Sequence, residues 1–255
     1  RYSESGGKWL LIASLAAFVA ALFSSEEAFT LPVLIALYEV IFQQLFAKVR
    51  QNNKALMPLL LFFVILAVFL FLRVVVLDVG ARADSYPGGT FLTTFATMPK
   101  VILFYLLLAF VPYNTVLYRE IHQSSFLIPI FLVYFIILAA IVFAGIRYHK
   151  KYKLFSFSVF WFFITLLPVS NLYSLNAYMA EHWLYLPSAG FFMMLGAAFT
   201  RHLEREKLKK AAIIAAAALL GLYSFLTVAQ NARWRDAASL YEWTVKHSPD
   251  STRAL

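Results

Sequence analysis

The chain has 255 residues, of which 62% are hydrophobic and only 14% are charged. Soluble domains carry about a quarter charged residues, and several apolar runs here approach or exceed the roughly 18 residues that span a bilayer core. A soluble domain is therefore excluded, and we predict an all-α, polytopic helical membrane protein. The chain contains no cysteine, which excludes disulfides and thiolate metal sites.

The net charge is +9, from 22 Lys and Arg against 13 Asp and Glu. In a soluble protein this excess would suggest nucleic acid as a partner. Here the basic residues gather in short turns between apolar runs, which is the usual pattern of cytoplasmic loops. We therefore expect membrane lipids beside these residues and no nucleic acid.

Residues 1–228 are predicted to form a transmembrane helical bundle. Seven apolar runs are interpreted as spans, near residues 8–24, 28–46, 55–77, 127–146, 155–169, 189–200 and 211–228. An eighth run, residues 100–111, provides only about 18 Å of helix, which is too short to cross a bilayer comfortably.

Three basic loops predict the orientation of the bundle. Residues 47–54, 147–153 and 201–210 hold most of the Lys and Arg in short loops, so we expect all three on the cytoplasmic side. Both flanks of residues 100–111 then lie outside, which predicts a re-entrant or interfacial helix. In the alternative, residues 100–111 span and the first three helices are inverted, which would place the first basic loop outside.

The predicted orientation puts the remaining polar clusters on one outer face. They are Glu26 with Glu27, Arg82 with Asp84, Arg119 with Glu120 and His122, and Glu181 with His182. Arg73 is expected just below them, near the end of its span. Ionisable groups at membrane depth are costly and tend to face a cavity or a partner. Such a set above the bundle is what a site for a charged, lipid-linked substrate needs.

Residues 229–255, after the last apolar run, are amphipathic and polar. Aromatic and apolar side chains recur there at helical spacing: Trp234, Ala238, Tyr241 and Val245. A Ser-Pro-Asp sequence at 248–250 stops the helix. The pattern is similar to the second helix of a tetratricopeptide repeat, with Pro249 at the repeat boundary. We predict the start of a tetratricopeptide-repeat region, the alternative being an ordinary juxtamembrane helix.

Five stretches in a fixed order carry a family resemblance. They are SSEEAFTLP at 24–32, KVILFYLLLAFVP at 100–112, WFFITLLPVSN at 161–171, AEHWLYLPS at 180–188 and WRD at 234–236. In this order the chain resembles the transmembrane and tetratricopeptide-repeat-containing proteins and their bacterial relatives. These belong to the GT-C superfamily of membrane glycosyltransferases and are related to protein O-mannosyltransferases. The stretch at 180–188 is the most specific part, although many relatives have Arg at the position of Trp183.

The resemblance implies a GT-C-like C-terminal transmembrane bundle. It implies transfer of a sugar, such as mannose, from a polyprenyl-phosphate donor to a hydroxyl of an acceptor, expected to be a protein. Transfer would occur on the lumenal or periplasmic side, and the repeats would dock the acceptor or a partner. The terse loops suggest a bacterial inner membrane with a periplasmic repeat region. Since the sequence opens at Arg1 without an initiator methionine, we expect a fragment whose general base lies upstream.

Sugar transfer from a lipid phosphate develops negative charge on the leaving phosphate, and an aimed cation or hydrogen-bond donor stabilises that charge. Carboxylates can orient sugar hydroxyls, position an arginine or hold a divalent metal ion. The candidate substrate-binding residues are therefore Glu27, Arg73, Arg119, Glu181, His182 and Tyr185. The His spacing predicts no metal site. Each residue also has a structural interpretation: a polar helix end for the acids, snorkelling for Arg73, and the interfacial aromatic belt for Tyr185.

Two other functions fit the same sequence. One is a non-catalytic membrane anchor that displays a tetratricopeptide-repeat scaffold outside the cell. The other is a transporter or lipid flippase, for which paired broken helices in matching halves would be expected. We see no such pairing in the sequence.

Overall fold

The computed structural model describes residues 7–78, 85–112, 121, 129–175 and 177–247, and all regular structure within them is helical. The helices are α2 (Lys8–Ser24), α3 (Leu31–Ile41), α4 (Leu45–Gln51), α5 (Met57–Phe71), α6 (Phe91–Phe110), α7 (Pro129–Tyr148), α8 (Lys153–Leu166), α9 (Tyr185–Leu203), α10 (Glu206–Arg233) and α11 (Ala237–His247). Short 3-10 turns occur at Glu26–Thr30, Asn53–Leu56, Leu167–Val169 and Glu181–Leu184, and a π-helical turn, Leu72–Val76, extends α5. The all-α prediction is confirmed for these residues.

Five of the described helices are long and apolar enough to cross a membrane. They cover Met57–Val76, Phe91–Phe110, Ile130–Tyr148, Glu181–Leu203 and Glu206–Arg233. In the first and last of these, only 6% of the most apolar window is buried inside the protein. Apolar surface of that extent is stable against lipid and not against water. The chain is therefore a polytopic helical membrane protein.

The second expected span, near residues 28–46, is not one straight helix. α3 ends at Ile41, Gln44 adopts a left-handed conformation with φ of 52°, and α4 leaves at an angle of 81°. The Lys48 ammonium then lies 3.3 Å from the Glu39 carboxylate and 3.1 Å from the Gln43 side-chain oxygen. The polar Gln pair breaks the helix, and this ion pair holds the bend.

The helix expected over residues 100–111 has different bounds. α6 begins at Phe91 and has 20 residues, so the argument that it is too short to cross is wrong. The Thr90 hydroxyl caps its start by accepting the Thr93 N–H at 3.2 Å, and Pro99 is tolerated inside the helix. Sequence reasoning stopped at this proline because proline usually breaks a helix. The re-entrant path itself stays a prediction.

The C-terminal helices also exceed their expected bounds. The span near 189–200 belongs to α9, which starts at Tyr185, and the span near 211–228 belongs to α10, which continues to Arg233. Several of the charged and polar residues at these ends have helix propensities close to those of the apolar residues in the centre, so the helices continue past the apolar runs. After α10 the described chain contains one more helix, α11, so a tetratricopeptide repeat stays a prediction.

α8 and α9 pack closely because of one glycine. A Cβ atom on Gly190 would lie 2.7 Å from the Ser158 carbonyl oxygen and 2.9 Å from Cδ1 of Trp161. The Trp161 indole N–H also donates to the Leu186 carbonyl at 2.9 Å. Small residues commonly let membrane helices approach in this way. The contact fixes the start of α9, which the Glu181–Leu184 turn immediately precedes.

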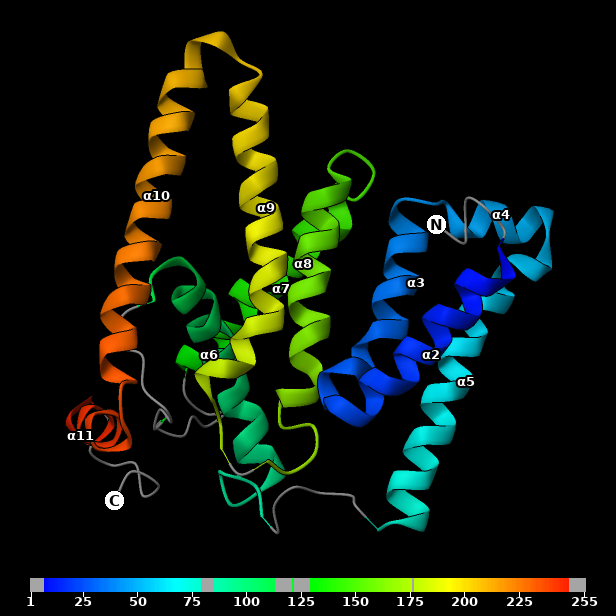
Figure 1. Cartoon of the computed structure of the whole chain (residues 1–255), viewed down its shortest axis with the longest axis horizontal. Helices are drawn as coiled ribbons and strands as arrows, with labels where there is room; N and C mark the ends of the chain where they lie inside the picture. The colour runs from blue at the N-terminus through cyan, green and yellow to red at the C-terminus, as the bar shows by residue number, and fades with distance from the viewer. Residues whose placement is uncertain (1–6, 79–84, 113–120, 122–128, 176, 248–255) are drawn as a thin grey trace.

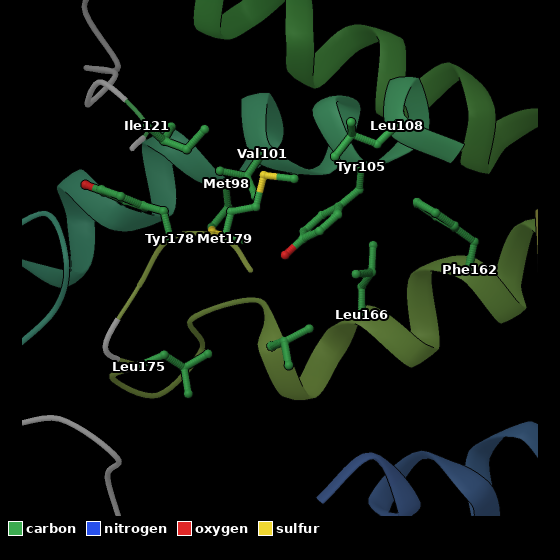
Figure 2. Packing of buried hydrophobic residues seen from close by; sticks show 11 residues of the cluster. Met98, Val101, Tyr105, Leu108, Ile121, Phe162, Leu166, Leu175, Tyr178 and Met179 are labelled. Atoms are coloured by element: carbon green, nitrogen blue, oxygen red, sulfur yellow. The ribbon is translucent and has the colours of Figure 1, made fainter. Parts of the chain in front are cut away.

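A buried cluster joins α6 and α8 to the loop before α9 (Figure 2). At its centre the fully buried Tyr105 hydroxyl donates to the Ala180 carbonyl at 3.0 Å and accepts from the Ala180 N–H at 3.1 Å. The N–H and the carbonyl of buried Ala180 thereby have a partner, and the carbonyl also accepts the Trp183 N–H at 3.1 Å, which avoids a desolvation penalty. In Figure 2 the side chains of Leu166 and Met179 approach Tyr105 from α8 and from the loop. α6 therefore fixes the residue immediately before Glu181.

The N-terminal helices α2, α3 and α5 form a second apolar cluster. The rings of Phe18 and Phe62 meet at its centre, with centroids 5.3 Å apart. α3 connects this group to α8, because Tyr38 and Phe42 both contact the Phe157 ring at 6.4 and 5.5 Å. The chain thus has two helical groups that meet along α3 and α8 (Figure 1).

The basic segments lie toward one end of the molecule. In Figure 1, α4 and the turns between α7 and α8 and between α9 and α10 lie in the upper half of the view. The turn between α2 and α3 and the segment from α8 to α9 lie at the lower ends of their helices. The orientation prediction requires this arrangement. Which side of a membrane each end faces stays a prediction.

Candidate functional site

An ion pair between Glu26 and Arg73 connects the α2–α3 turn to the end of α5. Its side chains are only 14% and 21% exposed. The second carboxylate oxygen of Glu26 accepts the Tyr173 hydroxyl at 2.9 Å. One half-buried carboxylate therefore holds side chains from three segments that are far apart in the sequence.

Local backbone structure presents both members of this pair. The Ser25 hydroxyl accepts the Glu27 N–H at 3.3 Å, which starts the tight Glu26–Thr30 turn. Arg73 lies in the π-helical turn that ends the α5 span, and its guanidinium lies 5.8 Å from the centroid of the Phe29 ring. Such π-turns occur often at functional sites, because they redirect side chains that a regular helix would place elsewhere.

Glu27 and His182 lie within electrostatic range of each other, one in each of the two helical groups. The two side chains interact electrostatically, although 155 residues separate them (182 minus 27). The imidazole also contacts the neighbouring Trp183 ring, with centroids 5.7 Å apart. We use the name polar cluster for five residues: Glu26, Glu27, Arg73, Tyr173 and His182. It contains two acids, an arginine and a histidine at the end of the bundle opposite the basic turns.

Glu181 lies beside the polar cluster and is oriented by α6. Its neighbour Ala180 is fixed by Tyr105, and the Glu181 carboxylate interacts electrostatically with the Tyr105 hydroxyl. Two adjacent residues of one 3-10 turn thus interact with different segments: Glu181 with α6 and His182 with the α2–α3 turn. Tyr185 is 83% exposed at the start of α9, so it does not pack into the cluster.

The structure therefore brings together three of the six residues expected from the sequence, Glu27, Arg73 and His182, and places Glu181 next to them. Arg119 lies outside the described residues, as do the other expected polar positions Arg82, Asp84, Glu120 and His122. Sequence reasoning ranked Glu27 above Glu26, although Glu26 is the partner of Arg73. It missed Tyr173, whose only signal was its place in the polar loop after α8.

The arrangement suits binding of an anion and of hydroxyl groups. The guanidinium of Arg73 carries five N–H donors in a planar arrangement, and a single carboxylate accepts at most some of them. The other donors can bind an anion. Glu26 and Tyr173 hold the guanidinium in place, so little side-chain entropy is lost when a phosphate binds. The carboxylates of Glu27 and Glu181 can accept hydroxyl protons. Among the described residues no group of three or more His, Asp and Glu side chains is placed to hold a metal ion.

The fold and the polar cluster define the class: a polytopic helical membrane protein with a half-buried ionic site at one end of its bundle. Part of the chain is similar to the protein O-mannosyl-transferase Tmtc2 of Drosophila melanogaster, with 33% identity over 85 residues. That stretch covers 32% of this chain and 9% of the length of the fly protein. No family model matches the chain, and no solved structure matches it. The partial similarity supports a relationship to this group of proteins.

Proposed function

We propose that this chain is part of a membrane O-mannosyltransferase of the GT-C type, which uses a polyprenyl-phosphate-linked sugar as donor and a protein hydroxyl as acceptor. The polar cluster is the observation that carries the proposal. It gathers an arginine, a histidine and two carboxylates at one end of an apolar bundle, where the phosphate and sugar of a lipid-linked donor would lie. The partial similarity to Tmtc2 supports the reaction class.

In this proposal Arg73 binds the donor phosphate. Negative charge grows on that phosphate as the sugar leaves, so a fixed guanidinium stabilises the transition state more than the ground state. His182 adds a second donor beside it. Arg119 is proposed to contribute from outside the described residues.

The carboxylates are proposed to orient the sugar. Glu27 interacts electrostatically with His182, and Glu181 precedes His182 in the same 3-10 turn, so each is proposed to accept a hydrogen bond from a sugar hydroxyl. Tyr185 is proposed to contact the acceptor side of the sugar, because its ring is exposed. We assign none of these acids as the general base.

The orientation and the tail complete the proposal. The polar cluster faces the lumenal or periplasmic side, and the basic turns face the cytoplasm. α11 begins a tetratricopeptide-repeat region that docks the acceptor protein or a partner.

Sugar transfer by membranes that contain the full-length protein tests the proposal. The assay supplies polyprenyl-phosphate mannose and an acceptor peptide rich in Ser and Thr, and measures transferred mannose. Glu181→Ala is expected to lower the rate by on the order of a hundredfold, since it removes a group aimed at the sugar. An unchanged transfer rate in Glu181→Ala would contradict the proposed role of Glu181. Absence of transfer by the wild-type protein from any polyprenyl-phosphate sugar would sink the function.

A further inference from the structure

A basic pocket lies at the opposite end of the bundle from the polar cluster. It has a volume of about 290 Å³ and is lined by the turn between α7 and α8, the first turn of α8 and the second half of α9. Its polar rim consists of Lys151, Lys153 and Arg201 around the ring of Tyr152. Among the described residues that line it, none is acidic.

Two cations converge on the tyrosine at the centre of this rim. The Arg201 guanidinium lies 4.3 Å and the Lys151 ammonium 5.2 Å from the centroid of the Tyr152 ring. Contact with Lys151, and then the charge of Arg201, lowers the pKa of the Tyr152 hydroxyl. The positive potential at this point is therefore not neutralised within the pocket.

The basic pocket lies next to a larger apolar cavity. Phe155 and Met194 line both this pocket and a larger cavity of about 540 Å³ between α6, α7, α8 and α9. That cavity is lined almost entirely by apolar side chains, among them Ile141, Phe162 and Phe191. A cationic rim beside an apolar cavity fits a lipid with an anionic headgroup.

We propose that the basic pocket binds the phosphate headgroup of an anionic phospholipid, with one acyl chain in the apolar cavity beside it. The position agrees with this ligand, because the pocket lies where three apolar helices give way to a basic turn. Headgroups lie at that depth in a bilayer, and basic pockets between transmembrane helices are suited to them. Its volume is close to the lower limit of small-molecule sites, so it holds a headgroup and not a whole lipid. A free phosphate would use the rim alone and leave the cavity empty.

Thermal unfolding of the purified chain in a non-ionic detergent tests the proposal. Dioleoyl phosphatidylglycerol is titrated as the probe, with dioleoyl phosphatidylcholine and inorganic phosphate in parallel. A ligand that binds the folded state raises the unfolding midpoint as its concentration exceeds its dissociation constant. We expect phosphatidylglycerol to raise the midpoint and the other two to have little effect.

Charge-matched variants locate the site. Lys151→Gln, Lys153→Gln and Arg201→Gln together are expected to weaken apparent binding of phosphatidylglycerol by roughly ten- to a hundredfold. The matched control removes three charges from the next basic turn instead: Arg205→Gln, Lys207→Gln and Lys210→Gln. It is expected to bind as the wild type does. Arg201→Gln alone, an exposed single change, is expected to weaken binding about fivefold and provides the test if the triple variant does not fold.

Three results would overturn the proposal. Equal loss of binding in the two triple variants would mean diffuse attraction to the basic end. Equal stabilisation by phosphatidylcholine would mean that the negative headgroup is not recognised. Equal stabilisation by inorganic phosphate would assign the pocket to a soluble anion and leave the cavity without a role.

Discussion

Gly190→Ala is expected to loosen the packing of α8 against α9. The new Cβ atom would lie 2.7 Å from the Ser158 carbonyl oxygen, 2.9 Å from Cδ1 of Trp161 and 3.2 Å from the Phe162 backbone nitrogen. Two of these three neighbours are backbone atoms, which cannot turn aside as a flexible side chain can. Overpacking of this kind costs about 1–3 kcal/mol.

The helical preference of alanine offsets part of this cost, by about 1 kcal/mol in a helix interior. The net loss is therefore about 0–2 kcal/mol in stability, with a further loss of precision where the Glu181–Leu184 turn meets α9. Gly196→Ala in the same helix is the matched control, because its Cβ atom meets nothing within 4 Å. We expect it to be neutral or stabilising.

Thermal unfolding in detergent measures the difference between the two variants. For a chain of this size, 1 kcal/mol corresponds to about 2–4 °C in the midpoint. We expect Gly190→Ala to unfold several degrees below Gly196→Ala, because only the first meets a neighbouring backbone. Equal midpoints would refute the close approach of α8 and α9.

Three further changes test other contacts. Tyr105→Phe removes the hydroxyl that accepts the N–H of buried Ala180 and donates to its carbonyl, and only the carbonyl keeps another donor, the Trp183 N–H. We therefore expect a loss of about 1–3 kcal/mol in detergent unfolding, and an unchanged midpoint would contradict that contact. Tyr173→Phe removes a hydrogen bond to a half-buried carboxylate and is expected to cost about 1.5–3 kcal/mol in the same measurement. Hydrogen bonds from the first turn of α11 lower the pKa of Asp236, so its capping is present above the unfolded pKa and is lost as pH falls through the folded pKa. We expect the amides of α11 to lose exchange protection on acidification through the range below the ordinary pKa of aspartate, and Asp236→Asn to abolish that acid step, whereas persistence of the step in this variant would be inconsistent with the cap.

The sequence predicts the existence of most of these helices, because long apolar runs leave the backbone few ways to satisfy its hydrogen bonds in lipid. It fails at polar breaks inside those runs. The predicted helix begins only after Pro99, so the first half of α6 is not predicted, and the left-handed Gln44 divides the second span. Both outcomes depend on neighbouring side chains, which periodicity does not report.

The candidate site shows the same limit. The residue types predict that Glu27, Arg73 and His182 belong to one outer surface, since each charge is costly at membrane depth. The choice of Glu26 as partner of Arg73 depends on the phase of the π-helical turn after α5. The hydrogen bond from Tyr173 depends on the path of the loop after α8. Neither is fixed by local sequence.

The role of Arg73 in donor binding is the central claim, and steady-state transfer kinetics test it most directly. Membranes with the full-length protein are assayed over a range of polyprenyl-phosphate mannose concentrations. The variants are Arg73→Gln and the control Lys48→Gln, which breaks a comparable ion pair with Glu39 at the other end of α3. We expect kcat/KM for the donor to fall on the order of a hundredfold in Arg73→Gln and to stay near the wild-type value in Lys48→Gln. Equal values of kcat/KM in Arg73→Gln and the wild type would contradict the claim.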